Sequence, residues 1–184
     1  MAELFITSDT HFGHANIIKY TGRPFKDVYH MDTELIRRWN ERVAPEDTVI
    51  HLGDFCFKNS PGGKEGEGTV NPAKYYTDQL NGKIIPIKGN HDKNNSFNTH
   101  ITGLEISFGK YMFWATHRPD DCDFAYKINL VGHVHDKWQY RTYWNTSNMK
   151  NILLINVGVD QHNFYPLKMT QVLQLIARIK RNDK

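Results

Sequence analysis

Five short polar clusters, each placed directly after an apolar run, contain most of the residues in this sequence that could do chemistry. They occupy residues 8–11, 53–54, 89–92, 116–117 and 132–135. In α/β folds, the loops that leave the carboxyl ends of strands converge on the ligand site. We therefore expect one pocket to collect the donor side chains of these clusters, which are Asp9, His11, Asp54, Asn90, His117, His133 and His135.

The donor types in this set indicate a transition-metal centre. Imidazoles, carboxylates and an amide oxygen together suit manganese, our first expectation, and also iron, zinc, cobalt or nickel. Magnesium prefers an all-oxygen shell, and structural zinc is commonly held by thiolates. Seven donors exceed the needs of one ion, so we expect two divalent ions. The predicted assignment is one ion on Asp9, His11 and His135, a second on Asn90, His117 and His133, and Asp54 bridging them.

Spacing and charge add two constraints on this centre. Asp9 and His11 are separated by one residue, as are His133 and His135, and such neighbours point opposite ways on an extended chain. Each loop must therefore bend, or each member of a pair must serve a different ion. Two dications and two aspartates leave a net charge of about +2, which an anionic phosphate ester would neutralise. Each cluster alone is common in ordinary turns, and the occurrence of all five carries the prediction.

The apolar runs predict the strands that position these clusters. We expect strands at residues 4–7, 48–52, 83–88, 127–131 and 152–157. A β-hairpin should join 106–108 to 111–115 through Gly109-Lys110. Between His135 and Ile152 lies a run of aromatic residues just past the last cluster, for which the pattern assigns no strand. The strand pattern favours a mixed sheet or two packed sheets.

Three helices are expected around these strands. Apolar residues recur every four positions at Met31, Leu35, Trp39 and Val43, which predicts a helix over about 32–43. Asp32 or Thr33 would cap its start, and Pro45 follows its end. Shorter apolar patterns predict helices at 73–80 and through 172–179. Helices early and late with strands between them indicate the α/β class.

Composition limits the classes of protein that fit. The 184 residues suit a single domain over 1–184, in which the Gly-, Lys- and Glu-rich segment 58–72 would be a mobile loop or lid. The net charge is +3 with Lys and Arg scattered, unlike a dedicated DNA binder. No apolar run is long enough for a membrane span. The N-terminus does not resemble a secretory signal, and two cysteines fit a reducing compartment, so a cytoplasmic location is expected.

The ordered clusters resemble the motifs of the calcineurin-like metallophosphoesterases: Asp-x-His, Gly-Asp, Gly-Asn-His-Asp, His and Gly-His-x-His. Residues 7–18, 23–25 and 51–55 are similar to a compact bacterial and phage branch of that family. The resemblance covers most of residues 4–168. It implies a four-layer α/β/β/α sandwich with two mixed sheets, and the metal assignment above. One departure is Thr116, which precedes His117 where the broad family often has glycine.

Two-metal chemistry then predicts the reaction. The ions would acidify a shared water, and the resulting bridging hydroxide would attack a phosphodiester or phosphomonoester in line. His91 lies beside a ligand without being one, and an imidazolium can donate a proton near pH 7, so we expect it to be the general acid. Asp92 would orient His91. The expected activity is that of a metal-dependent phosphoric ester hydrolase.

Residues that would contact the substrate are less well marked. His14, Asn16 and Arg118 follow ligand loops and could reach phosphate oxygens, and Arg23 and His162 are weaker candidates. An aromatic cluster past the last ligand could stack on a nucleotide or a nucleic-acid end, pack in the core, or form a homodimer contact. That cluster consists of Trp138, Tyr140, Tyr143 and Trp144.

Two alternative functions remain open at this point. One is a non-catalytic scaffold on the same fold, as in the retromer subunit, although such proteins tend to lose ligand histidines that are all present here. The other is a nuclease acting on nucleic-acid ends, for which a chain of this size has little room for a capping domain. A small nucleotide-like ester suits the size better. The sequence does not select the natural substrate, monoester or diester preference, the metal or the oligomeric state.

Overall fold

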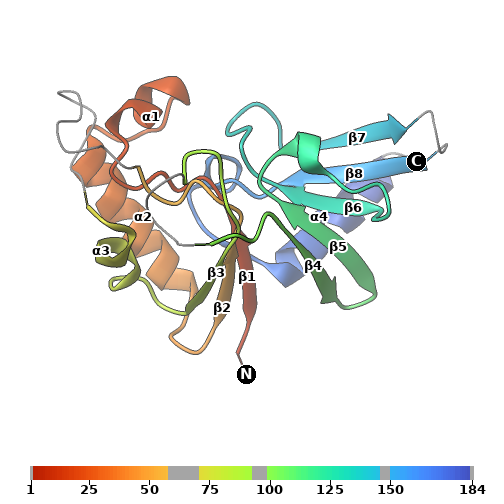
Figure 1. Ribbon diagram of the computed structural model, residues 1–184, viewed down its shortest axis with the longest axis horizontal. Helices are drawn as coiled ribbons and strands as arrows, with labels where there is room; N and C mark the ends of the chain where they lie inside the picture. The colour runs from red at the N-terminus through yellow and green to blue at the C-terminus, as the bar shows by residue number, and fades with distance from the viewer. Residues whose placement is uncertain (1, 58–70, 93–98, 146–149, 183–184) are drawn as a thin grey trace.

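Two mixed β-sheets form the centre of the computed structural model, which describes residues 2–57, 71–92, 99–145 and 150–182 (Figure 1). The first sheet has the order β3 (Lys83–Pro86), β2 (Thr48–His51), β1 (Leu4–Thr7) and β9 (Leu167–Lys168). Strands β1, β2 and β3 are parallel, and β9 is antiparallel to β1. Most of the predicted loop 58–72 lies outside the described residues.

The second sheet contains five strands. Its order is β4 (Gly103–Phe108), β5 (Tyr111–Thr116), β6 (Ile128–Val131), β8 (Lys150–Asn156) and β7 (Tyr140–Asn145). Strands β5, β6 and β8 run parallel, whereas β4 and β7 are antiparallel edge strands. The β4–β5 hairpin and the buried strands β6 and β8 confirm the predicted strands. The aromatic cluster forms much of β7, which the sequence reading left unassigned.

Helix α2 (Val28–Arg42) begins earlier than predicted. Its cap is Asp27, whose side chain accepts the His30 N–H at 2.7 Å, rather than Asp32 or Thr33. Asp32 lies inside the helix, and its carboxylate accepts the Gly13 N–H at 3.0 Å and the Tyr76 hydroxyl at 3.2 Å. A residue expected to cap a helix therefore fixes the segment that follows the first ligand loop.

The remaining helices are α1 (Ala15–Tyr20), α3 (Ala73–Thr77) and α4 (Met169–Asn182). Among the described helices, none combines the length and apolar character that crossing a membrane requires. Helix α1 was not anticipated, because six residues are too few to show a helical period. Helix α4 presents an apolar stripe that includes Val172, Ile176 and Ile179.

Three apolar clusters hold the layers together. The largest joins facing residues of the two sheets, such as Ile6 and Phe113, to the apolar stripe of α4. A second lies between the other face of the first sheet and helices α1 to α3, around Trp39. A third, smaller cluster covers the remaining face of the second sheet, around Leu154. The predicted α/β class with two mixed sheets and flanking helices is confirmed.

Candidate metal centre

The five polar clusters meet at one edge of the paired sheets. Strands β1, β2 and β3 are parallel, so the residues after them lie together, and β5 and β6 deliver the last two clusters to the same place. Two groups of donor atoms result, each within 4.8 Å of one another: Asp9 with His11 and His135, and Asp54 with His117 and His133. We name them the first and the second group.

The backbone bends at the donors themselves. Five candidate ligands have positive φ angles, between 48° and 70°: Asp9, His11, Asp54, His133 and His135. This left-handed conformation costs a non-glycine residue roughly 1–2 kcal/mol. The bend brings Asp9 and His11 into one group, whereas His133 and His135 belong to different groups, so each of the two expected alternatives describes one pair. Backbone strain is thus concentrated where donors must converge.

Close approach of the loops depends on two glycines. A Cβ at Gly132 would lie 2.1 Å from Ser8 Oγ and 2.5 Å from Asp9 Oδ2. A Cβ at Gly89 would lie 2.2 Å from Asp54 Oδ1. Neither position has room for a side chain, so the glycine of each motif serves to bring one ligand loop against another.

Each aspartate uses one oxygen to fix itself and leaves the other facing the donors. Asp9 Oδ2 accepts the backbone N–H of His133 at 2.8 Å, and Asp54 Oδ1 accepts that of His91 at 2.8 Å. Asp54 Oδ2 lies 3.6 Å from His11 Nε2 and 3.3 Å from His117 Nε2. One carboxylate oxygen therefore stands between a histidine of the first group and a histidine of the second.

Two histidines have one ring nitrogen held by a partner that leaves the other for the centre. His117 Nδ1 donates to the Leu52 carbonyl at 2.7 Å, and its Nε2 lies 2.9 Å from Asn90 Oδ1. His135 Nδ1 lies 3.0 Å from Asp160 Oδ2. A bond at Nδ1 fixes the ring and directs Nε2 to a metal. Asn90 thus lies beside the second group.

Arg23 lies behind the first group instead of reaching for substrate. It is buried, and its guanidinium pairs with Asp160 at 2.8 Å and 3.0 Å. The same guanidinium donates to the carbonyls of Asp9, at 2.7 Å, and Thr10, at 2.9 Å. These bonds and a contact with Met31 use its donors, so the weaker prediction that Arg23 binds phosphate is wrong. Asp160, which no sequence motif marked, is the residue that sequence reasoning missed.

The electrostatics of the donors fit bound cations. Burial raises the pKa of Asp9 and lowers that of His11 well below its ordinary value. Burial opposes protonation of His117, but its hydrogen bond to Asp54 and the charges of Asp9 and Asp54 outweigh burial and raise its pKa to about 9. Without a cation, a proton on His117 compensates the buried Asp54.

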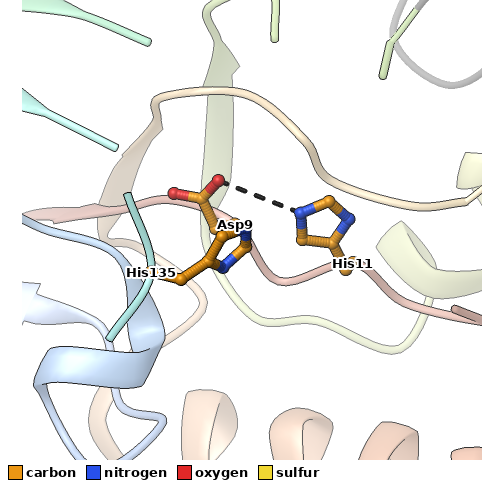
Figure 2. Close-up of side chains that lie close together, drawn as sticks. All are labelled: Asp9, His11 and His135. Atoms are coloured by element: carbon orange, nitrogen blue, oxygen red, sulfur yellow. Dashed lines mark ion pairs between the residues drawn. The ribbon is translucent and has the colours of Figure 1, made fainter. Parts of the chain in front are cut away.

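Two buried atoms of the first group have no hydrogen-bond partner among the described residues: Asp9 Oδ1 and His11 Nε2. They face each other across 3.9 Å, with His135 beside them (Figure 2). Buried polar atoms are normally paired, because leaving one unpaired costs about 1–3 kcal/mol. A divalent cation between a carboxylate and imidazoles would satisfy both atoms, and this donor set suits borderline transition metals. The residues therefore fit the ions predicted from the sequence.

His91 and Asp92 differ from each other in placement. The His91 side chain is exposed, and its ring centroid lies 5.6 Å from that of His11. Asp92 is buried, and its carboxylate accepts the backbone N–H groups of Asp54 at 2.8 Å, Phe55 at 3.2 Å and Gly89 at 2.8 Å. Asp92 thus fixes the loop of Asp54, and the expected orientation of His91 by Asp92 is wrong.

The predicted substrate contacts fall into separate environments. His14 stacks on Phe57 at 4.1 Å, its Nδ1 has no partner among the described residues, and burial lowers its pKa to about 4. Asn16 lies in the first turn of α1, and Arg118 is exposed directly after His117. His162 instead donates from Nε2 to the Asn156 carbonyl at 2.8 Å.

The aromatic cluster does not act as one surface. Asn156 Nδ2 donates to the carbonyls of His135 and Trp138, which places the start of the cluster near the centre. Trp144 pairs with Asn151 at the opposite end of β8. Five strand positions separate Asn156 from Asn151, a span of roughly 17 Å. Trp144 is thus poorly placed to stack on an ester bound at the donors.

Comparison with known proteins supports this arrangement. A family model of the calcineurin-like phosphoesterase superfamily domain matches residues 3–170. The uncharacterized protein MJ1445 of Methanocaldococcus jannaschii is 34% identical over 183 residues, 98% of this chain and 94% of that protein. The gene 66 protein of Mycobacterium phage L5 is 29% identical over 92 residues, 50% of this chain and 41% of that protein. A protein of unknown function from Aquifex aeolicus, AQ665, has a similar fold, with TM-score 0.65, 22% identity, and coverage of 95% of this chain and 100% of that one.

Proposed function

The chain belongs to the calcineurin-like phosphoesterase superfamily, and we propose that it hydrolyses phosphate esters with two divalent transition-metal ions, manganese first among them. The phage relative is consistent with the compact bacterial and phage branch. The observation that carries the proposal is the position of Asp54 Oδ2, 3.6 Å and 3.3 Å from histidine nitrogens of the two donor groups. An oxygen in that place suits a bridging ligand.

Charge supports an anionic substrate. Two bound dications would exceed the charge of the two aspartates, and the surplus favours a phosphate ester at the centre. When bound, the ions would supply an acidified water and would stabilise charge on the phosphate oxygens. The two buried carboxylates would hold the two ions in place, because one oxygen of each carboxylate is fixed by a backbone N–H and the other faces the donors.

His91 is the proposed general acid. Its backbone is tied to Asp54, while its ring is exposed at the edge of the donor groups. An imidazolium there can donate a proton to the leaving alkoxide. His14, Asn16 and Arg118 remain the proposed contacts to the phosphate. The unpaired, buried Nδ1 of His14 favours His14 among these three.

A small ester, phosphodiester or phosphomonoester, is the proposed substrate class, with a nucleotide as one example. Within the aromatic cluster, Trp138 and Tyr140 lie on the side of the centre, since Tyr140 pairs with Ile155 near the carboxyl end of β8. A base of the substrate would stack there rather than on Trp144. Alanine at Tyr140 should raise the Michaelis constant for nucleotide esters, whereas alanine at Trp144 should leave it unchanged.

The test is a manganese-supplemented screen with p-nitrophenyl phosphate and bis-p-nitrophenyl phosphate. Wild type should hydrolyse at least one of them. Asp54→Ala should lose ions and activity together, and His91→Ala should keep the ions and lose turnover, most of all for esters with poor leaving groups. Two bound ions with no turnover on any ester would instead fit the scaffold alternative. Full activity of His91→Ala on poorly activated esters would remove its acid role.

A further inference from the structure

A cavity of about 630 Å³ lies at the end of the second sheet that is far from the metal centre. The first residues of β5 and β6 line it, and these strands run from there toward His117 and His133. Figure 1 shows α4 passing behind the two strands, and its last turns supply Ile179 and Lys180 to the cavity. The volume lies in the range of small-molecule sites, roughly 300–1,000 Å³.

The walls of this cavity are largely apolar. They include Met112, Ile128, Ile152, Leu153 and Ile179. Ile128, Ile152 and Ile179 are buried in the packed layers, so the walls are rigid. Met112 remains 45% exposed, although its neighbours on β5 point into the core. A ligand with an apolar body would remove the remaining surface of Met112 from water, which favours binding in proportion to the area covered.

Positive charge surrounds the cavity. Lys110, Lys127 and Lys180 line it, and no ion pair among the described residues involves any of them. The ammonium groups of Lys110 and Lys180 lie 5.7 Å and 5.1 Å from the centre of the Tyr111 ring. Two ammonium groups therefore lie within 6 Å of the centre of one aromatic ring, and neither has an ion-pair partner in the described part of the chain.

One carboxylate, Glu105, lines the described part of the cavity, and it accepts the hydroxyl of Tyr126. Three lysines and one glutamate leave the lining two positive charges in excess. An excess of charge of one sign at an apolar cavity favours a ligand that combines an apolar body with the opposite charge.

We propose that this cavity binds a small organic anion with an apolar, ring-sized body. The apolar walls cover the body, and Lys110 and Lys180 hold the anionic group beside Tyr111. A bare phosphate is a poor fit, because it would strip water from the apolar walls without covering them. A nucleic-acid strand is a poor fit too, because it requires a groove that follows the backbone charges.

A matched pair of dyes tests the proposal on the full chain. The first is 8-anilinonaphthalene-1-sulfonate, and the second is N-phenyl-1-naphthylamine, which lacks only the sulfonate. Fluorescence titration should show saturable binding of the anionic dye at one site per chain. The neutral dye should bind at least tenfold more weakly, because it gains the apolar walls but not the lysines.

Two kinds of variant show where the dye binds: one reverses the charge of the lysines at the cavity, and the other fills the cavity. The double variant Lys110→Glu/Lys180→Glu should weaken binding of the anionic dye at least tenfold. The control Lys19→Glu/Lys83→Glu changes two exposed lysines on α1 and β3 and should leave it unchanged. Thr142→Trp, which fills the cavity from the edge strand β7, should abolish binding. Circular dichroism and urea unfolding check that each variant is folded.

Several results would overturn the proposal. These are equal affinity for the two dyes, no saturable binding up to 100 µM dye (about the top of a practical titration), or unchanged binding in the folded charge-reversal variant. If Asp54→Ala no longer bound the anionic dye although its cavity was intact, the dye would bind at the metal centre instead. The same variant also tests the proposed hydrolysis. If Asp54→Ala kept dye binding but lost activity, the cavity and the metal centre would be shown to be separate sites.

Discussion

The two donor groups of the metal centre are supported in different ways. In the first group, His135 bonds Asp160, which is paired with Arg23, and Arg23 also bonds the carbonyl of Asp9. In the second group, His117 bonds a neutral carbonyl, that of Leu52. A buried ion pair thus stands behind one group, whereas the Leu52 carbonyl and the carboxylate of Asp92, which accepts the Asp54 N–H, stand behind the other. Both supports come from residues distant in sequence, since Asp160 is 25 positions from His135 and Leu52 is 65 positions from His117.

The difference extends to the donor atoms. The first group contains two buried atoms without a partner among the described residues, Asp9 Oδ1 and His11 Nε2. In the second group, Asp54 Oδ2 and Asn90 Oδ1 both lie within 3.3 Å of His117 Nε2. We infer that a proton on His117 can stabilise the second group when no metal ion is bound, whereas the first group is stabilised more by binding a metal ion.

The largest expected effect comes from removing the residue that the two groups share. Asp54→Asn keeps the shape of the side chain but loses the charge beside both histidines. Activity should fall at least about a hundredfold, and bound metal should drop at both groups. Asp9→Asn should reduce metal mainly at the first group. Elemental analysis of dialysed protein, together with turnover, distinguishes the two variants, and equal loss from both would contradict a shared role for Asp54.

A smaller effect is expected behind the first group alone. Asp160→Asn removes the charged partner of His135 and leaves Arg23 unpaired. Metal affinity at the first group should fall about 10- to 100-fold, as for other residues that orient ligands. Calorimetric titration should show one weakened ion and one unchanged. Asp120→Asn, a change of an exposed carboxylate three residues after His117, serves as control. Equal weakening of both ions would show that the two groups are not independently supported.

The smallest expected effect concerns His51, which lies beneath the second group. It accepts the Gly53 N–H at Nδ1, at 3.2 Å, and its Nε2 lies 3.1 Å from Thr10 Oγ1, so the neutral ring is fully bonded. Burial lowers its pKa from 6.5 to about 3. Below pH 6.5 the unfolded chain binds a proton that folded His51 does not, so the free energy of unfolding falls with falling pH, by at most about 1.4 kcal/mol per pH unit.

This pH dependence can be isolated by substitution. His51→Asn keeps an acceptor near the Gly53 N–H but does not titrate. In chelator, urea unfolding between pH 6.5 and 5 should show a flatter slope for the variant than for wild type. The remaining slope would come from the other groups whose pKa values the fold shifts. Burial also lowers the pKa values of His11, His14, His133 and His162, whereas carboxylate partners outweigh burial and raise those of His117 and His135. Identical slopes for the two proteins would mean that His51 is not held neutral.

Much of the fold could be read from local pattern. Apolar runs located the buried strands, and the four-residue period of Met31, Leu35 and Trp39 located α2. The start of α2 was misplaced because Asp27 and Asp32 are equally good caps locally, and only the bond from Asp27 to the His30 N–H decides between them. Strand β7 was missed because its aromatic residues read equally well as a surface for stacking.

The sequence by itself determined the donors: their types and their positions after strands are enough to predict that a pair of metal-binding groups forms. The tertiary structure decided which atom of each donor faces the centre. His135 Nδ1 is held by Asp160, 25 positions later in the chain. Asp160 is held in turn by Arg23, which lies 137 positions before Asp160. Such partners carry no local signal, because a single aspartate or arginine becomes a support only when folding buries it beside its counterpart.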